Sequence, residues 1–222
     1  MPSDRSMSVR PGTSPVRLAR ADFNRPTLDV ARALLGKVIV RRVDRVEIAG
    51  MISEVEAYKG PLDRAAHTWG GRRTSRVLPL YGDGGTIYVY LVYGVHWLLN
   101  FSTAGSDIPE GVLIRGLLAE TASGVRRIHG PGLVTRHLRI DGTLSGHDAT
   151  TSDALWIEDH GVRVPPAMIR RGPRVGVDYA GAYWAARPWR FWIAPDFAPT
   201  AQRKTTASAS SRVDRRPPAE EP

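Results

Sequence analysis

The chain of 222 residues contains no cysteine. This absence excludes disulfide bonds, cysteine-ligated zinc and iron–sulfur clusters. It also excludes the zinc-dependent base deaminases, which hold their metal with paired cysteines. The six histidines are scattered, and HExxH and similar spacings are missing, so we do not expect metal catalysis.

Long apolar runs are also missing. No run approaches the roughly 20 residues that a transmembrane helix requires. The N-terminus, MPSDRSMSVRPGTSP, is polar and does not resemble a secretion signal. The default expectation is a soluble, intracellular protein. There is no GxSxG, Walker lysine or GxGxxG, and the glycines at 82–85 precede an expected strand, so we do not expect a nucleotide-binding loop there.

Lysine is scarce, and acidic residues are outnumbered. There are 31 lysine and arginine residues against 22 aspartate and glutamate residues, and the formal net charge is +9. Only Lys37, Lys59 and Lys204 are lysines. This charge favours a polyanionic partner such as a nucleic acid, and the planar guanidinium suits phosphate. Codon bias could produce the same arginine excess, so charge alone leaves the partner open.

Both ends of the chain are poor in large apolar residues. Residues 1–16 and 200–222 are rich in serine, threonine, proline, alanine and charge, and we expect two disordered tails. The body between them, residues 17–199, has the length of a single domain. It shows no repeat of a solenoid or propeller.

The body begins with an expected helix and continues with strands. In residues 25–37, Thr27 can cap a helix and Gly36 can end it. Its apolar stripe consists of Leu28, Ala31, Leu34 and Leu35. The apolar period then changes to two, which predicts strands over 37–43, 50–58, 86–94, 96–102 and 111–118.

The second half of the body predicts further short strands. They cover 154–159, 162–166, 173–179 and 188–194, with the first two as a hairpin around His160 and Gly161. Residues 119–137 could be helical. Many strands with few helical crossovers predict an α+β fold, a mixed domain with a largely antiparallel sheet.

Residues 51–58 place two carboxylates beside an aromatic ring. In a strand, alternation puts Glu54, Glu56 and Tyr58 on one face. Such a row is typical of a solvated strand edge. It could instead be the wall of a site in which one carboxylate acts as a general base. His67 could return to that face after a turn, although a lone histidine is more commonly structural.

Tyrosines are concentrated in the expected strand over 86–94. Tyr88 and Tyr90 share one face, and Tyr93 precedes Gly94 near a bend. Strand tyrosines ordinarily pack in a core. The alternative is that one ring stacks on a nucleobase while another projects from a hairpin as a wedge into the base stack.

Two longer patterns, EAYxGPxDxAAH and YVYxxYGxxxxxN, are highly specific, and other stretches follow in order. These stretches are RPTLDVARALLGKVIVRR, EVEAYKGPLDRAAHTWGGRRT, GTIYVYLVYGVHWLLN, GVLIRGL, GPG, PRVGVDYAG and PWRFW. In these motifs and in their order, the chain resembles the alkyladenine (3-methyladenine) DNA glycosylase family. The resemblance covers essentially the whole body, from about Asp22 to Ile193.

The resemblance implies a fold and a pocket. The family fold is a single mixed domain around a curved, largely antiparallel β-sheet with flanking helices. Glu56 corresponds to the general base that activates water for attack on the sugar C1′. Tyr58 and Tyr90 correspond to the rings that sandwich a flipped base, and His67 to the third wall and a hydrogen-bond donor. Asn100 corresponds to a residue that obstructs the guanine amino group.

Two further correspondences concern the DNA outside the pocket. Tyr93 corresponds to the side chain that fills the gap in the duplex, and Arg115 to a contact near the phosphate of the target nucleotide. The chain departs from the family pattern at Val77–Tyr81, Leu133–Ile140 and Ala182, and in SGHDA at 145–149. These departures concern backbone contacts, loop packing and substrate range.

The resemblance also implies the activity. The family consists of monofunctional DNA glycosylases of base excision repair, which remove alkylated or deaminated purines and leave an abasic site. No lysine corresponds to a Schiff-base residue. The expected partner is double-stranded DNA containing a damaged purine, and we expect a monomer without metal or cofactor. The alternative is a non-catalytic protein that binds lesions or duplex DNA with the same fold.

Overall fold

The computed structural model describes residues 14–197. In this range ten strands form one antiparallel sheet, with the continuous order β1-β8-β2-β3-β6-β5-β4. β7 also pairs with β6, and β10 pairs with both β3 and β9. The expected α+β class with a largely antiparallel sheet is therefore confirmed.

The elements of this range are short apart from two long strands, β3 and β6. The strands are β1 (Val16–Arg17), β2 (Val38–Val43), β3 (Val46–Tyr58), β4 (Ile87–Val92), β5 (His96–Thr103), β6 (Glu110–Thr121), β7 (Gly124–His129), β8 (Leu155–Asp159), β9 (Ile169–Gly172) and β10 (Arg190–Ile193). The α-helices are α1 (Arg20–Phe23), α2 (Thr27–Leu34), α3 (Pro131–His137) and α4 (Ala182–Ala185). The 3-10 helices are η1 (Gly60–Leu62), η2 (Trp69–Gly71), η3 (Leu78–Tyr81), η4 (Gly142–Leu144), η5 (Pro166–Met168) and η6 (Asp178–Ala180).

The two expected tails fall mainly outside the described residues. Residues 1–13 and 198–222 are not covered, so the expected disorder and the domain limits stay predictions. Of the expected N-terminal tail, residues 14–16 are described. Val16 begins β1 and pairs with Asp159 of β8.

Helix α2 follows the expected stripe, with one difference at its start. Ala31 and Leu34 are buried in the main apolar cluster. Thr27 is the first helical residue rather than the cap, and its hydroxyl is hydrogen-bonded to Thr103 at 2.8 Å and to Glu110. The distance in sequence to these two partners explains why a local capping rule assigned Thr27 differently.

Several expectations for the second half are wrong. Residues 119–129 continue β6 into a hairpin with β7, because Gly124 adopts a φ of 112° and lets the chain reverse. Helix α3 begins only at Pro131. Neither 162–166 nor 173–179 forms a strand, and the second contains η6. The expected hairpin of 154–159 with 162–166 is therefore absent, and the next strand along the chain, β9, pairs with β10.

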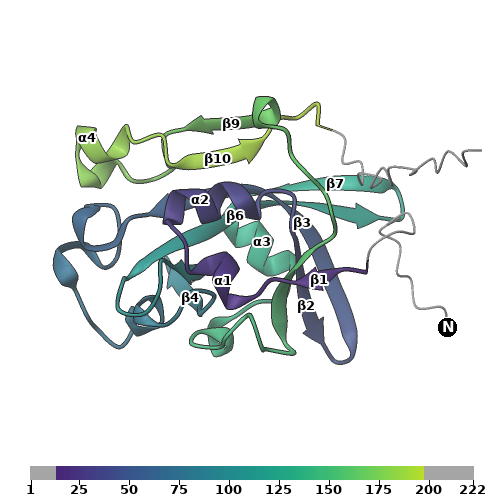
Figure 1. Ribbon diagram of the computed structural model, residues 1–222, viewed down its shortest axis with the longest axis horizontal. Coiled ribbons are helices and arrows are strands. Elements are labelled where there is room, and N and C mark those ends of the chain that lie inside the picture. Colours follow the sequence, from purple (N-terminus) through teal and green to yellow (C-terminus); the bar gives the residue numbers. More distant parts are fainter. Residues whose placement is uncertain (1–13, 198–222) are drawn as a thin grey trace, which may run out of the picture.

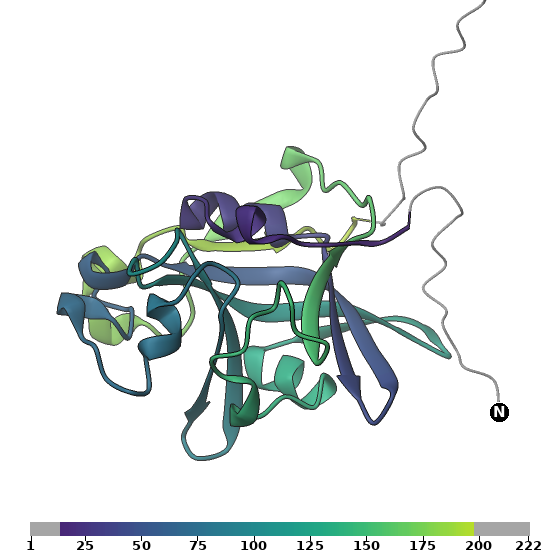
Figure 2. The same cartoon turned by 60° about the horizontal axis from the view of Figure 1, so that its bottom comes forward.

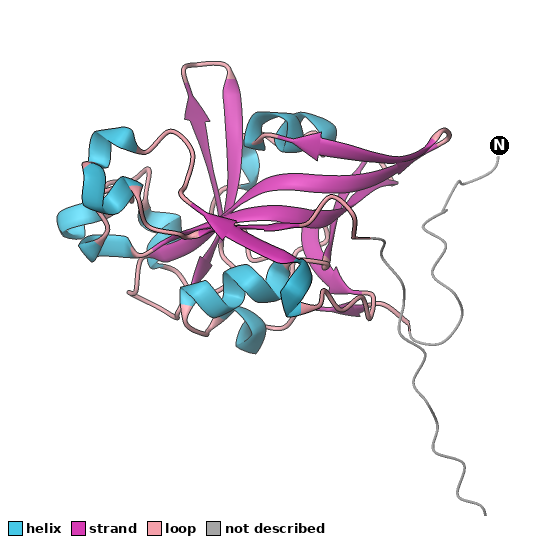
Figure 3. Ribbon diagram, turned by 90° about the horizontal axis from the view of Figure 1, so that it is seen from above, coloured by secondary structure: helices cyan, strands magenta, loops and turns pink. Residues whose placement is uncertain are grey.

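In space, hairpins project from the body and short helical turns gather at one end. Figure 1 shows β9 and β10 side by side along one edge of the molecule, with α4 beyond their ends. Figure 2 shows the β4–β5 hairpin projecting from the body. In Figure 3 short helical turns gather at one end of the sheet.

Two offset irregularities interrupt the pairing of β3 with β6. Ile52 pairs with Leu117 and Glu54 with Gly116, whereas Val55 already pairs with Ile114. Each strand thus contains one extra residue, Ser53 in β3 and Arg115 in β6. Because an extra residue changes the side to which a strand points its side chains, Arg115 and Gly116 both meet the carboxylate face of β3.

We predict that Gly116→Ala destabilises the protein. An added Cβ would lie 3.0 Å from the Cβ of Glu54 and 3.3 Å from the carbonyl oxygen of Ile128, and neither atom can move freely. The free energy of unfolding in urea should fall by about 1–3 kcal/mol, as in other overpacked cores. Ser123→Ala on the exposed β6–β7 turn is the control and should change it by less than about 0.5 kcal/mol. Equal stability of the two variants would contradict the tight packing of β3 on β6.

Candidate active site

A cavity of about 310 Å³ is built where the ends of strands β3 to β6 meet the loops around η1, η2 and η6. Its walls contain most of the residues singled out in the sequence. They include Tyr58, His67, Tyr90, Tyr93, Asn100 and Arg115. Residues from 58 to 179 therefore converge on one site, and five tyrosines are among the residues that line it.

Glu56 lies behind this wall with no exposed surface. Three groups that line the cavity hold its carboxylate. The Tyr58 hydroxyl donates to Oε2 at 2.9 Å, the Val175 N–H donates to Oε1 at 2.8 Å, and the Arg115 Nε lies 3.3 Å from Oε1. Burial raises the pKa of Glu56, while the charge of Arg115, and to a lesser degree the other two groups, opposes that rise.

Glu54 has different partners. Its carboxylate lies 2.8 Å from the Nδ1 of His129 and 3.6 Å from the Nη1 of Arg190, and the Nε of Arg115 is 3.3 Å away. Glu54 and Glu56 are only 5% and 0% exposed, so the interpretation as a solvated strand edge is wrong. The shared face is confirmed by Arg115, which bridges both. Of the two carboxylates, only Glu56 is bonded to Tyr58 and to the N–H of Val175, and both of these residues line the cavity.

Three rings form the opposite wall of the cavity. The ring centroids of Tyr88 and Tyr90 are 5.2 Å apart in a stacked arrangement, which confirms that they share a face. The His67 ring meets Tyr90 edge-on, with centroids 4.5 Å apart. Tyr88 is fully buried, and its hydroxyl is 2.8 Å from the Nδ1 of His67. This contact fixes the ring of His67, so the loop after η1 does return to the site.

His67 is uncharged at neutral pH. Its pKa falls to about 4, mainly because burial disfavours the imidazolium and also because Arg76 and Arg72 are positive. Since the Nδ1 is engaged with Tyr88, the Nε2 is the ring nitrogen left for the cavity. A neutral imidazole suits a site that already contains several cations.

Asn100 lies in the cavity wall on β5, directly opposite Tyr88 of β4. Its amide nitrogen donates to the carbonyl oxygens of Tyr88 at 3.2 Å and Leu98 at 3.4 Å. With 6% of its surface exposed, the side chain has a fixed orientation. A buried amide held by its own strand pair is a rigid part of the wall.

Tyr93 is placed very differently from the other tyrosines. It lies between β4 and β5, where Tyr93 and Gly94 adopt φ angles of 52° and 69°. Positive φ at two successive residues is the geometry of a tight hairpin turn whose twist matches its strands. The residue is 92% exposed in the turn of the β4–β5 hairpin. It reaches the edge of the cavity as well as the solvent.

The sequence did not reveal the buried pair behind Tyr58. Arg174 donates to both carboxylate oxygens of Asp63, at 2.5 and 2.9 Å, and both side chains are fully buried. Asp63 is part of a recognised motif, but 111 residues separate the two partners. Tyr179, whose hydroxyl donates to the carbonyl oxygen of Ala65 at 3.0 Å, also lines the cavity and was not singled out.

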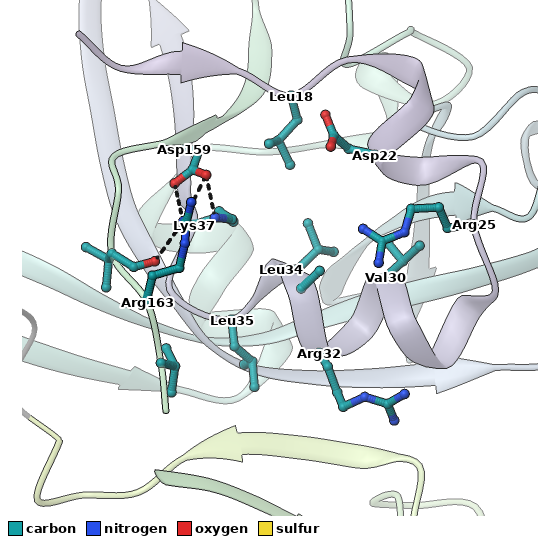
Figure 4. Close-up of a pocket in the computed structure, with 13 residues that line it drawn as sticks. Leu18, Asp22, Arg25, Val30, Arg32, Leu34, Leu35, Lys37, Asp159 and Arg163 are labelled. Carbon is teal, nitrogen blue, oxygen red and sulfur yellow. Dashed lines mark hydrogen bonds and ion pairs between the residues drawn. The ribbon is translucent and has the colours of Figure 1, made fainter. Parts of the chain in front are cut away.

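A second cavity, also of about 310 Å³, lies away from these residues against α2 (Figure 4). Leu34 and Leu35 form part of its apolar wall, and the ion pair of Lys37 with Asp159, 2.7 Å long, stands at its side. It contains none of the site residues expected from the sequence. The aromatic cavity at Tyr58 is therefore the candidate active site.

Two further observations concern the described residues, 14–197. No group of three or more histidine, aspartate or glutamate side chains among them is arranged to hold a metal ion. None of their helices has the length and hydrophobicity needed to cross a membrane. A buried carboxylate beside an aromatic slot can take a proton from water and stabilise a nearby positive charge.

Comparison with known proteins gives a consistent result. The profile of the methylpurine-DNA glycosylase family matches residues 21–196. A protein of Clostridium perfringens strain SM101 named as a 3-methyladenine DNA glycosylase is 37% identical over 201 residues, covering 80% of this chain and 96% of that protein. One of Bacillus cytotoxicus with the same name is 42% identical over 194 residues, covering 75% and 91%. The DNA-3-methyladenine glycosylase of Mus musculus is 36% identical over 200 residues, covering 80% and 59%.

We predict that Arg115→Gln raises the pKa of Glu56 further. The guanidinium is the strongest of the groups that oppose the effect of burial on this carboxyl. The ionised form should then be lost at a higher pH as the solution is acidified. Carbon NMR of the side-chain carboxyl across acidic and neutral pH measures the change. Arg126→Gln on the exposed strand β7 is the control, and an unchanged pKa in the Arg115 variant would contradict this account.

Proposed function

Because the chain belongs to the methylpurine-DNA glycosylase family, we propose that Glu56 activates the water with which it hydrolyses the glycosidic bond of a damaged purine. The chain is a DNA-3-methyladenine glycosylase of base excision repair, and its substrate is damaged DNA. The interpretation as a non-catalytic DNA-binding protein is therefore set aside. One observation carries the proposed roles: the three groups that hold the buried Glu56 also line a single aromatic cavity.

The base must first leave the double helix. A purine in the stack is out of reach of a buried carboxylate, so the nucleotide has to be rotated into the cavity. The cavity volume of about 310 Å³ is at the lower end of small-molecule sites, which suits one base. Tyr93 supports this step because an exposed ring on a projecting hairpin can fill the gap and offset part of the unstacking cost.

The aromatic rings of the cavity bind the flipped base. Alkylated purines are electron-poor or cationic, and the faces of Tyr58 and Tyr90 attract such bases by stacking and cation–π contact. Each contact of this kind contributes roughly 0.5–2 kcal/mol. His67 is neutral and can exchange a hydrogen bond with the base without repelling a positive charge. The same slot can take neutral deaminated purines by stacking alone, so we include them in the substrate range.

The bond is then broken by water. Glu56 in its ionised form removes a proton from the water as the water oxygen attacks C1′ of the sugar. The negative charge of the carboxylate stabilises the oxocarbenium-like sugar. An alkylated purine leaves readily because departure relieves its positive charge. Among residues 14–197 no lysine lines the cavity, and the nearby Lys59 is paired with Glu110 at 2.7 Å. The product is therefore an abasic site without strand cleavage through a Schiff base.

We propose that exposed arginines near the cavity contact the phosphates of the DNA backbone. Arg72, Arg73 and Arg76 lie in the loop between η2 and η3 and are exposed, and Arg76 lies over the ring of Tyr90, which lines the cavity. Arg115 is 7% exposed and is largely engaged with the two carboxylates, so its contact with the target phosphate would be made from inside the cavity. We propose that the protein acts as a monomer on double-stranded DNA.

Glu56→Gln should abolish base release while leaving lesion binding nearly intact. An amide keeps the shape and accepts the bond from Val175, but it cannot take a proton from water. We expect single-turnover release of 3-methyladenine to fall by at least about 100-fold, the usual contribution of a general base. Binding to a lesion duplex by fluorescence anisotropy should change by less than about threefold. Unchanged release would remove Glu56 from the mechanism.

Tyr93→Ala should weaken binding to lesion-containing duplex about tenfold or more, because no ring then fills the gap left by the flipped base. Tyr183→Ala is the matched control, since Tyr183 is another exposed tyrosine, 61% accessible, which does not line the cavity. Anisotropy titrations at several salt concentrations measure both variants. The slope against salt should be the same in each, because neither residue is charged. Equal losses in the two variants would show that Tyr93 is not the wedge.

A further inference from the structure

Behind Tyr58, a guanidinium is packed between two rings. The Cζ of Arg174 lies 4.6 Å from the centroid of Tyr58 and 5.0 Å from that of Trp189. Its side chain has no exposed surface. Arg174 does not line the aromatic cavity, whereas Tyr58 does. The guanidinium therefore contacts the Tyr58 ring from within the protein, and Trp189, which is half-buried, contacts the guanidinium in turn.

The guanidinium is held firmly in this layer. Besides its two bonds to Asp63, the Nη1 of Arg174 donates to the carbonyl oxygen of Ala57 at 3.0 Å. Asp63 in turn accepts from the backbone N–H groups of Lys59 and Ala65, at 3.0 Å each. The pair is neutral as a whole, but its positive end faces the ring. Asp63 and Arg174 thus fix a positive charge against the ring of a tyrosine that also lines the cavity.

A positive charge on one face of an aromatic ring weakens the attraction of the other face for a second cation. The ring quadrupole attracts both cations, but they repel each other through the ring, and a buried site screens that repulsion poorly. A neutral base feels little of this effect, because stacking and dispersion do not depend on its net charge. The ring is therefore set to discriminate less strongly in favour of cationic bases than an isolated tyrosine would.

On this geometry we propose that Arg174, through Tyr58, sets the balance between cationic and neutral purines in the pocket. It is a positioning residue that acts on the electrostatics of the ring and does not touch the base. The inference rests on the proposed function, since it needs a base stacked on the outer face of Tyr58. It explains how one slot can hold both alkylated purines, which carry positive charge, and neutral deaminated purines.

The test removes the charge and keeps the packing. Arg174→Gln combined with Asp63→Asn replaces the ion pair by two neutral amides that can still bond to each other. Both substitutions are made in the Glu56→Gln background, and binding is measured to duplexes that carry either one 7-methylguanine or one hypoxanthine. We expect affinity for 7-methylguanine relative to hypoxanthine to rise about three- to tenfold, the order of one cation–π contact.

Two further variants separate charge from structure. Arg174→Lys keeps the positive charge and should keep the affinity ratio within about twofold of the parent. The double variant Lys37→Gln, Asp159→Asn removes a comparable ion pair beside the cavity of Figure 4 and should leave the ratio unchanged. If the amide pair does not fold, Arg174→Met with Asp63→Leu replaces it, because buried ion pairs can often be exchanged for apolar groups.

The outcomes are distinct. An altered ratio in the neutral variants, retained in Arg174→Lys, supports the inference. A merely structural role would weaken binding of both lesions alike, and an unchanged ratio would overturn the proposal. Failure of the proposed function has another sign: the protein with Glu56 intact would release no purine from either duplex.

Discussion

The whole site depends on burying one carboxylate within a β-sheet. Glu56 has no exposed surface, and such burial is unfavourable for an ion unless other groups replace its hydration. A guanidinium, a backbone N–H and a phenol do so here. Each comes from a different part of the chain. The sheet, the bulge at Arg115 and the loop at Val175 must therefore all form before the Glu56 carboxylate has its three partners. Fold and catalytic group are in this sense one problem.

Local patterns predict what is local. Alternation along a strand suffices to put Glu54, Glu56 and Tyr58 on one face, because the period of a strand is a property of the backbone alone. It cannot tell whether that face is wet or buried, since this depends on the strands that pair on either side. Residues 119–129 show the same limit: a helix and a hairpin both fit their composition, and the turn at Gly124 decides between them.

Long-range partners are what the sequence hides. Arg174 and Asp63 are 111 positions apart, half the length of the chain, and 173–179 looks like a strand when its own residues are considered. In the fold that segment is a loop whose groups bond to distant residues. The side chain of Arg174 binds Asp63, and the backbone N–H of Val175 binds Glu56. The family resemblance pointed to residues that the fold brings together at one cavity, because motifs preserve the outcome of such packing without stating its cause.

The bond from residue 175 to Glu56 has a consequence for how this sequence can vary. The donor is a peptide N–H, which every amino acid except proline carries. The side chain of Val175 is 48% exposed and takes no part in the bond. Substitution there can remodel the rim of the pocket while Glu56, the proposed general base, keeps its partner. Proline is the exception, and it would remove the donor outright. Substrate preference can therefore diversify at this position without cost to the chemistry, provided that the path of the loop is conserved.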